Sequence, residues 1–218
     1  MTAWTPNAHV TLTNSNLTAS FNVDAGVYRG CIGTAGKTSG KYHYEGTIVA
    51  TSGGFHLFGF CNSSIDVTTS PIIGDANSAA IQFDLGTGLA YYYNAALIDE
   101  WNCAVVQGHV IAIEIDIGNS LVWFQDATLA TGWSRFGSSL FTGDPTDSVS
   151  GGGTSFSGIN QTGGIFPGVW GAYVSSNPET LTLNPGVVTS GVAFTAPVST
   201  GYVAWDASAG IPVWLFRS

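Results

Sequence analysis

The chain has 218 residues, enough for one large all-β domain around a single hydrophobic core. Charged residues make up only 9% of it, and five Lys and Arg against 14 Asp and Glu give a net charge of −9. So few basic residues cannot neutralise a nucleic-acid backbone or an anionic lipid surface, and no apolar run is long enough to span a bilayer. We therefore expect a soluble protein that neither binds nucleic acid nor inserts into a membrane.

The remaining composition points to an exposed all-β protein. There are 29 Gly residues, and aromatic residues make up 12% of the chain, a pattern typical of viral or extracellular proteins. The first seven residues lack the basic start and the apolar core of a secretory signal. Either a secretory signal has been removed, or the protein reaches the outside by another route, such as assembly into a virus particle released by lysis, and the initiating Met favours the second. We therefore expect a virion protein that is made in the host cytoplasm and exposed on the particle surface.

Short alternating segments separated by turn residues recur along the whole chain, as in an antiparallel β-sandwich. In the strand expected at 41–49, Tyr42, Tyr44 and Ile48 are candidates for burial. No segment keeps the apolar spacing of a long helix, and Ile98–Trp101 is at most a helical turn. The expected strands are 10–13, 17–19, 27–32, 41–49, 55–60, 79–84, 89–94, 110–117, 120–124, 165–174, 179–184 and 201–205.

One segment departs from this pattern. Ser138–Gly164 is rich in Gly, Ser and Thr and contains few large apolar residues. It is longer than an ordinary connection between strands, and loops of that length are usually functional or disordered. We expect an extended Gly/Ser-rich surface loop here.

The segment around Glu114 and Asp116 allows two interpretations. On a strand both carboxylates project from one side, as in a glycosidase site, while Ile113, Ile115 and Ile117 project from the other. The laminarinase-like sandwich enzymes, which this segment resembles, place a second Glu shortly after the Asp. Gly118-Asn119 stands there instead and favours a tight hairpin, because both residues tolerate a positive φ. We expect no catalysis, with both carboxylates facing solvent or accepting backbone hydrogen bonds.

Cysteine and histidine residues are scattered. Their spacing matches no metal-binding pattern, so we expect no metal and no cofactor. The three cysteines allow at most one disulfide, and buried thiols are the favoured interpretation because free cysteine packs as a small apolar residue. These residues are Cys31, Cys61, Cys103, His9, His43, His56 and His109.

Several segments, in order, resemble the SPRY family. Gly40–Glu45 is similar to its Gly-Lys-Tyr-Tyr-Phe-Glu strand, and Phe58–Phe60 to its Val-Gly-Val/Ile strand. Further matches are Gly108–Ala112 with Gly-Asp-Val-Ile-Gly, Asp116–Phe124 with Leu-Asp-Xaa-Xaa-Asn-Gly-Xaa-Ile-Xaa-Phe, Phe166–Val169 with Phe-Pro-Ala-Val, and Leu181–Gly186 with Val-Thr-Leu-Asn-Phe-Gly. The resemblance implies a bent sandwich of two antiparallel sheets, a concanavalin A-like jelly roll, and non-catalytic binding through loops.

A narrower likeness concerns three regions. Trp4–Ala19, the Gly/Ser-rich loop and Phe194–Trp205 are similar to SPRY-like structural proteins of tailed bacteriophages. Two positions depart from the SPRY pattern: Pro185 replaces its closing Phe, and Ser120 its second hairpin Gly. The likeness implies a capsid decoration, head fibre or tail-associated module whose partners are other virion proteins or further copies of the chain.

We expect one SPRY-like domain over 1–206 and an apolar tail over 207–218. The tail either folds back on its own sandwich or docks onto a neighbouring subunit, because contiguous apolar residues mark an interaction site. The alternatives to a virion structural protein are a lectin-like adhesin that binds host-surface glycan and a glycoside hydrolase-like sandwich. Candidate binding residues are the aromatics Tyr91, Tyr93, Trp101 and Trp133, and candidate assembly residues are Ile211, Val213, Trp214, Leu215 and Phe216.

Overall fold

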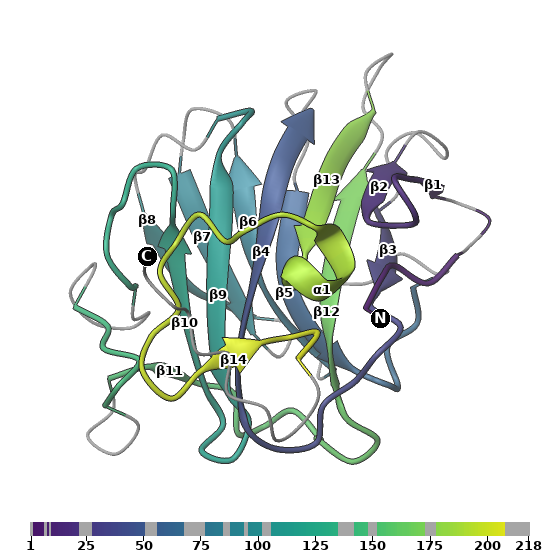
Figure 1. Cartoon of the computed structure of the whole chain (residues 1–218). Helices are drawn as coiled ribbons and strands as arrows, with labels where there is room; N and C mark the ends of the chain where they lie inside the picture. Colours follow the sequence, from purple (N-terminus) through teal and green to yellow (C-terminus); the bar gives the residue numbers. More distant parts are fainter. Residues whose placement is uncertain are drawn as a thin grey trace.

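A computed structural model of the chain shows two β-sheets stacked face to face, as an antiparallel sandwich requires (Figure 1). This confirms the all-β prediction. The structure describes residues 2–6, 8, 10–21, 28–50, 56–67, 77–84, 88–93, 96–101, 106–134, 142–147, 152–172 and 178–207.

The larger sheet has eight strands. They run in the order β1-β2-β13-β4-β9-β10-β11, and β14 pairs with β4 beside this path. All pairs are antiparallel except β14 with β4, which is parallel. The strands are β1 (Thr11–Thr13), β2 (Thr18–Phe21), β4 (Lys41–Ala50), β9 (Val110–Asp116), β10 (Leu121–Asp126), β11 (Thr154–Ser155), β13 (Glu179–Asn184) and β14 (Val203–Ala204).

The second sheet has six antiparallel strands in the order β3-β12-β5-β6-β7-β8. Neighbours along the chain pair from β5 to β8, whereas β12 returns from much later in the sequence to lie between β3 and β5. The strands are β3 (Tyr28–Ile32), β5 (His56–Asn62), β6 (Ser78–Asp84), β7 (Gly88–Tyr93), β8 (Ala96–Trp101) and β12 (Ile165–Ala172).

The hydrophobic core lies between the sheets. Ile113, Ile115 and Ile117 are all buried in it, as the alternation of β9 predicts. From β4, Tyr44 meets Phe58 of the other sheet edge-on, with ring centroids 5.6 Å apart. Tyr42 and Ile48 are buried as well, so all three burial predictions for this strand are confirmed.

The β9–β10 hairpin forms where the sequence predicts it, with Leu121 opposite Asp116. The expected cause was wrong in one respect, because the positive φ, 54°, falls on Ser120 and not on Gly118 or Asn119. Asn119 instead caps the turn, since its backbone N–H and its Nδ2 both donate to the Asp116 carboxylate, at 3.1 and 2.8 Å. The turn is thus fixed by an Asx-type contact.

The prediction for Ile98–Trp101 was wrong, because this segment belongs to strand β8. β8 pairs antiparallel with β7 and extends the smaller sheet, with a shift in register between Tyr91 and Tyr92. The local sequence has no clear alternation of apolar and polar residues. Hydrogen bonding to a strand that is already in place decides its conformation, which local pattern alone cannot show.

The prediction of an extended surface loop over 138–164 was also wrong for the part that the structure describes. Its second half contains β11 and places Phe156 and Ile159 in the core, with 0% and 2% of their surfaces exposed. Gly143 lies against Trp123 of the larger sheet, and the Trp123 Nε1–H donates to the Gly152 carbonyl at 2.7 Å. Two buried apolar side chains thus attach this Gly-rich segment to the sandwich.

The chain after β13 crosses the outer face of the larger sheet (Figure 1). It first forms the short helix α1 (Val187–Ser190), and the following segment, Val192–Ala207, is called the strap below. The strap ends in β14, and the buried Trp205 packs against Tyr44 with ring centroids 5.1 Å apart. No helix in the described part of the chain has the length and apolar character to cross a membrane.

Candidate functional site

The outer faces of β4 and β9 carry a row of ionisable side chains. Strand alternation turns Lys41, His43 and Glu45 of β4 away from the core. On β9, Glu114 and Asp116 also point away from it. The antiparallel register sets His43 directly opposite Glu114 and Lys41 opposite Asp116. Four of the five residues are buried, which is unusual for charged groups and requires that each have a partner.

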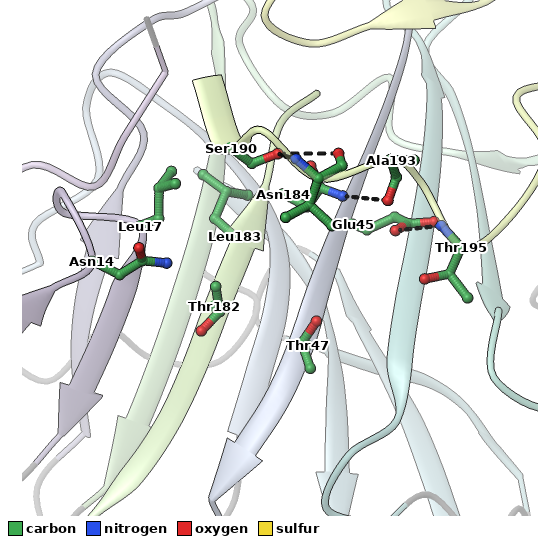
Figure 2. Close-up of a pocket in the computed structure, with 11 residues that line it drawn as sticks. Asn14, Leu17, Glu45, Thr47, Thr182, Leu183, Asn184, Ser190, Ala193 and Thr195 are labelled. Carbon is green, nitrogen blue, oxygen red and sulfur yellow. Dashed lines mark hydrogen bonds between the residues drawn. The ribbon is translucent and has the colours of Figure 1, made fainter. Parts of the chain in front are cut away.

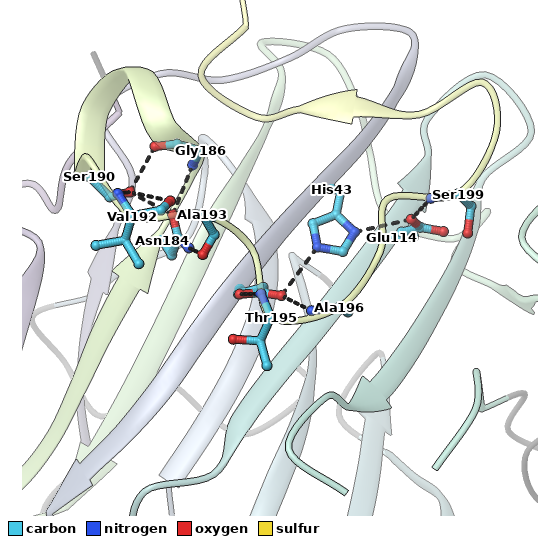
Figure 3. Close-up of polar contacts among 11 residues, drawn as sticks. His43, Glu114, Asn184, Gly186, Ser190, Val192, Ala193, Thr195, Ala196 and Ser199 are labelled. Atoms are coloured by element: carbon cyan, nitrogen blue, oxygen red, sulfur yellow. Dashed lines mark hydrogen bonds and ion pairs between the residues drawn. The ribbon is translucent and has the colours of Figure 1, made fainter. Parts of the chain in front are cut away.

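His43 lies between two carboxylates (Figure 3). Its Nδ1 is 3.0 Å from Oε1 of Glu114, a hydrogen bond, and its Nε2 is 3.6 Å from Oε1 of Glu45, within ion-pair distance. All three side chains are at most 1% exposed. We call these residues the His43 cluster.

The strap covers the His43 cluster and bonds to it through its backbone. The N–H groups of Ala196 and Thr195 donate to the two oxygens of Glu45, at 2.7 and 3.0 Å. Further along, the N–H of Ser199 donates to Oε1 of Glu114 at 2.8 Å. Each carboxylate therefore satisfies backbone donors of the strap, and such charge-assisted hydrogen bonds are the stronger kind.

The surroundings of His43 act on its pKa in opposite directions. Burial lowers the pKa, because it penalises the charged imidazolium, whereas the hydrogen bond to Glu114 and the charge of Glu45 raise it by more. The net effect is a pKa above the ordinary value for histidine. Two rings complete the enclosure: Phe194 of the strap, 4.4 Å from the imidazole centroid, and Trp133, 6.0 Å from it.

Of the two expectations for Glu114 and Asp116, solvent exposure was wrong and hydrogen bonding to backbone donors is confirmed. Asp116 is 2% exposed, accepts the N–H of Asn119 at 3.1 Å and pairs with Lys41 at 3.2 Å. Glu114 is fully buried under the strap. Carboxylates and a histidine, which are the groups used in acid–base catalysis, are thus present on one face, but the strap separates this face from solvent.

Beside the cluster the strap leaves a small hollow of about 130 Å³ (Figure 2). Polar side chains of the sheet and of α1 line most of it, and Glu45 and Thr195 belong to both the hollow and the strap contacts. The lining residues are Asn14, Leu17, Glu45, Thr47, Thr182, Leu183, Asn184, Ser190, Val192, Ala193 and Thr195.

Three valines are exposed on α1 and at the start of the strap, and one of them, Val192, lines the hollow. Val187 and Val188 of α1 and Val192 at the start of the strap leave 57%, 68% and 60% of their surfaces in solvent. Asn184 holds this corner in place, because its Oδ1 accepts the Ser190 hydroxyl at 2.7 Å. We call the three valines and the hollow together the α1 surface.

Comparison with solved structures identifies the architecture. The SPRY domain of human HERC1 is 14% identical, with a TM-score of 0.50 over 80% of this chain and 91% of that one. The TRIM65 PSpry domain is 13% identical, with a TM-score of 0.55 over 84% and 90%. The fold is that of SPRY domains. Stonustoxin is 14% identical with a TM-score of 0.53, and 84% of this chain covers 28% of that toxin chain.

At these identities the likeness concerns the SPRY fold alone. The amino-acid sequence itself matches no protein-family model and no curated protein. The resemblance inferred from sequence motifs is therefore confirmed at the level of a SPRY-like sandwich.

The SPRY-like sandwich places three of the four predicted binding aromatics on neighbouring strands and the fourth against the other sheet, and their binding role stays a prediction. Tyr91 and Tyr93 lie on β7 and Trp101 on the neighbouring β8, all in the smaller sheet. Trp133, in contrast, contacts His43 on the outer side of the larger sheet. The predicted assembly residues Ile211, Val213, Trp214, Leu215 and Phe216 lie outside the described residues, so their role stays a prediction.

Two of the three cysteines are described, and both are buried thiols, as predicted. Burial raises the pKa of the Cys31 thiol to about 12. Cys103 lies outside the described residues. Within the described part of the chain, no group of three or more His, Cys, Asp and Glu side chains is arranged to hold a metal ion.

The His43 cluster and the α1 surface were not predicted from the sequence. The sequence did contain a signal for the His43 cluster, since His43 and Glu45 stand on the polar side of an otherwise apolar strand. The missing information was the cover, because Thr195 and Ala196 lie 150 and 151 residues from Glu45 along the chain. Ser199 likewise lies 85 residues from Glu114. Nothing local marks such a contact.

Proposed function

We propose that this chain is a non-catalytic binding module that serves as a structural protein of a bacteriophage particle, as a capsid decoration, head fibre or tail-associated module. The SPRY-like fold supports a binding role, because the family resemblance implies binding through loops at the ends of a rigid sandwich. The likeness of Trp4–Ala19 and Phe194–Trp205 to SPRY-like phage proteins supports a structural role in a bacteriophage particle.

The absence of catalysis is supported by the state of the two carboxylates that resemble a glycosidase pair. Glu114 is fully buried and accepts the N–H of Ser199, and Asp116 is engaged by Lys41 and Asn119. A general acid must reach the glycosidic oxygen and exchange a proton with it, and a nucleophile must reach the sugar ring. Both carboxylates hold the fold together instead.

The observation that best supports a binding role is the α1 surface. Three exposed valines stand on α1 and at the start of the strap, where one of them lines a polar hollow and Asn184 and Ser190 fix the backbone. An apolar patch beside polar groups that are held in place is typical of a protein-binding surface. We therefore propose that the α1 surface contacts another virion protein.

The proposal predicts a specific loss of assembly. Val188→Asp places a charge at the most exposed of the three valines and should reduce incorporation into particles at least about tenfold, since the loss of one apolar anchor costs more than about 1.4 kcal/mol of binding. Leu129→Asp is the matched control, because Leu129 is 52% exposed in the β10 turn, away from this surface. Copy number in purified particles is the measurement.

Two results would count against the proposal. Equal incorporation of both variants would show that the α1 surface has no role in assembly. Absence of the wild-type chain from purified particles would contradict a virion role altogether. A stoichiometry that matches the capsid lattice would support a decoration protein.

A further inference from the structure

The strap is attached to the sheet in two ways. Trp205 anchors its end in the core, and β14 pairs with β4. Its first part begins at a hydrogen bond from Asn184 to the Ala193 carbonyl, and beyond that point three backbone N–H groups, those of Thr195, Ala196 and Ser199, donate to the carboxylates of the His43 cluster. The position of this part therefore depends on the charge of that cluster.

The geometry of His43 favours the protonated ring. Both of its ring nitrogens face carboxylate oxygens, at 3.0 Å for Glu114 and 3.6 Å for Glu45. A neutral imidazole donates from one nitrogen only and turns the lone pair of the other toward its neighbour. An imidazolium presents an N–H on both sides, so it donates the hydrogen bond to Glu114 and places its second N–H within ion-pair distance of Glu45, whereas a neutral ring that donates to Glu114 leaves a lone pair facing the Glu45 carboxylate.

No other described cation compensates these carboxylates within ion-pair distance. Lys41, on the same strand, pairs with Asp116 of β9. The strap contributes the uncharged Phe194 ring and, beyond the cluster, the Tyr202 hydroxyl, which donates to the Pro145 carbonyl at 3.1 Å. The 131–134 segment contributes the Trp133 ring, and the 142–147 segment carries only the acidic Asp144 and Asp147.

We propose that the strap is a proton-sensitive latch. It is closed over the sheet while His43 is protonated, and its first part detaches when His43 loses that proton and two buried carboxylates remain without a counter-charge.

The direction of the pH dependence follows from the sign of the pKa shift. The pKa of His43 is higher in the closed state than the ordinary value of about 6.5 that an exposed histidine has in the open state. The stabilisation of the closed strap is therefore complete below the ordinary pKa and is lost as the pH rises through the closed-state pKa. Between these two values the opening equilibrium increases about tenfold for each pH unit.

Opening would change the α1 surface as well. Ala193 and Thr195 form one wall of the hollow, and Glu45 lies both in the hollow and under the strap. The inference about the latch itself does not depend on the proposed binding function, since it concerns only the contacts within this chain.

The test is amide hydrogen exchange, measured by NMR on the wild-type protein and divided by the intrinsic exchange rate at each pH. The amides of Thr195, Ala196 and Ser199 should lose protection as the pH rises above the ordinary histidine pKa, and their protection should level off once the His43 ring has titrated. The amides of Ile113 and Ile115, in the core strand β9, should stay protected throughout. Constant strap protection while His43 titrates, or loss of protection at all five amides together, would overturn the proposal.

A pair of variants makes the test specific. His43→Gln removes the titrating group and should leave the strap amides weakly protected at every pH, with no transition. His109→Gln is the matched control, because His109 is also a buried histidine on an acid, 2.6 Å from Asp126, but does not touch the strap. If the transition persists in His43→Gln or disappears in His109→Gln, then His43 does not control the strap and the proposal is wrong. If His43→Gln does not fold, the wild-type titration alone decides.

Discussion

Replacing Phe156 by Ala tests whether the Gly-rich segment before β12 is part of the core. Phe156 is 0% exposed, and its ring lies 4.8 Å from that of Phe60 in an edge-to-face arrangement. Truncating a buried Phe costs about 3–5 kcal/mol, which includes the cavity that remains and the lost ring contact. For a chain of 218 residues this corresponds to a fall in Tm of about 6–20 °C.

The assay is urea and thermal unfolding of Phe156→Ala beside Thr162→Ala, an exposed position in the same segment. The control should stay within about 0.5 kcal/mol of wild type, as surface substitutions usually do. If Phe156→Ala also remained within that range, the segment would be a loop lying on the surface, and our account of how it is attached to the sandwich would be refuted.

Three further outcomes follow from the packing and the tail. Gly59→Ala should cost about 3 kcal/mol or more and lower the soluble yield, because its Cβ would clash with the backbone of β6; an unchanged urea midpoint would contradict this. In a Cys103→Ser protein, Cys31 and Cys61 should react with a thiol reagent at neutral pH only after unfolding, since both are buried; fast labelling of the native protein would show otherwise. Deleting 210–218 should abolish incorporation into particles if the tail docks onto a neighbouring subunit, and normal incorporation would refute that role.

Most strand positions, β8 and β11 excepted, could be predicted because local chemistry determines them. In the first hairpin, for example, Asn14, Ser15 and Asn16 all have positive φ, which Asn tolerates better than most residues, and alternating strands flank them. The order of strands in each sheet could not be predicted in the same way, because the pairing of β12 with β3 and β5 joins distant parts of the chain.

The candidate site was harder to predict than the fold. The alternation of β9 correctly put Glu114 and Asp116 on one side, opposite three isoleucines. The assumption that a polar side of a strand faces solvent was wrong here, because the strap supplies three N–H donors that replace water. Burial of both sides of a strand here depends on a segment that is remote in the sequence. The residues around His43 and Glu45 do not show that such a segment will cover them.

We propose that the carboxylates on β9 stabilise the fold and do not catalyse a reaction. The most direct measurement combines hydrolysis of a soluble β-glucan with thermal unfolding, for wild type and Glu114→Gln. We predict no hydrolysis by either protein and a less stable variant, by about 1–3 kcal/mol, because the buried charge bonds to Ser199 and His43. Hydrolysis by wild type that is lost in Glu114→Gln, with an unchanged Tm, would contradict the claim.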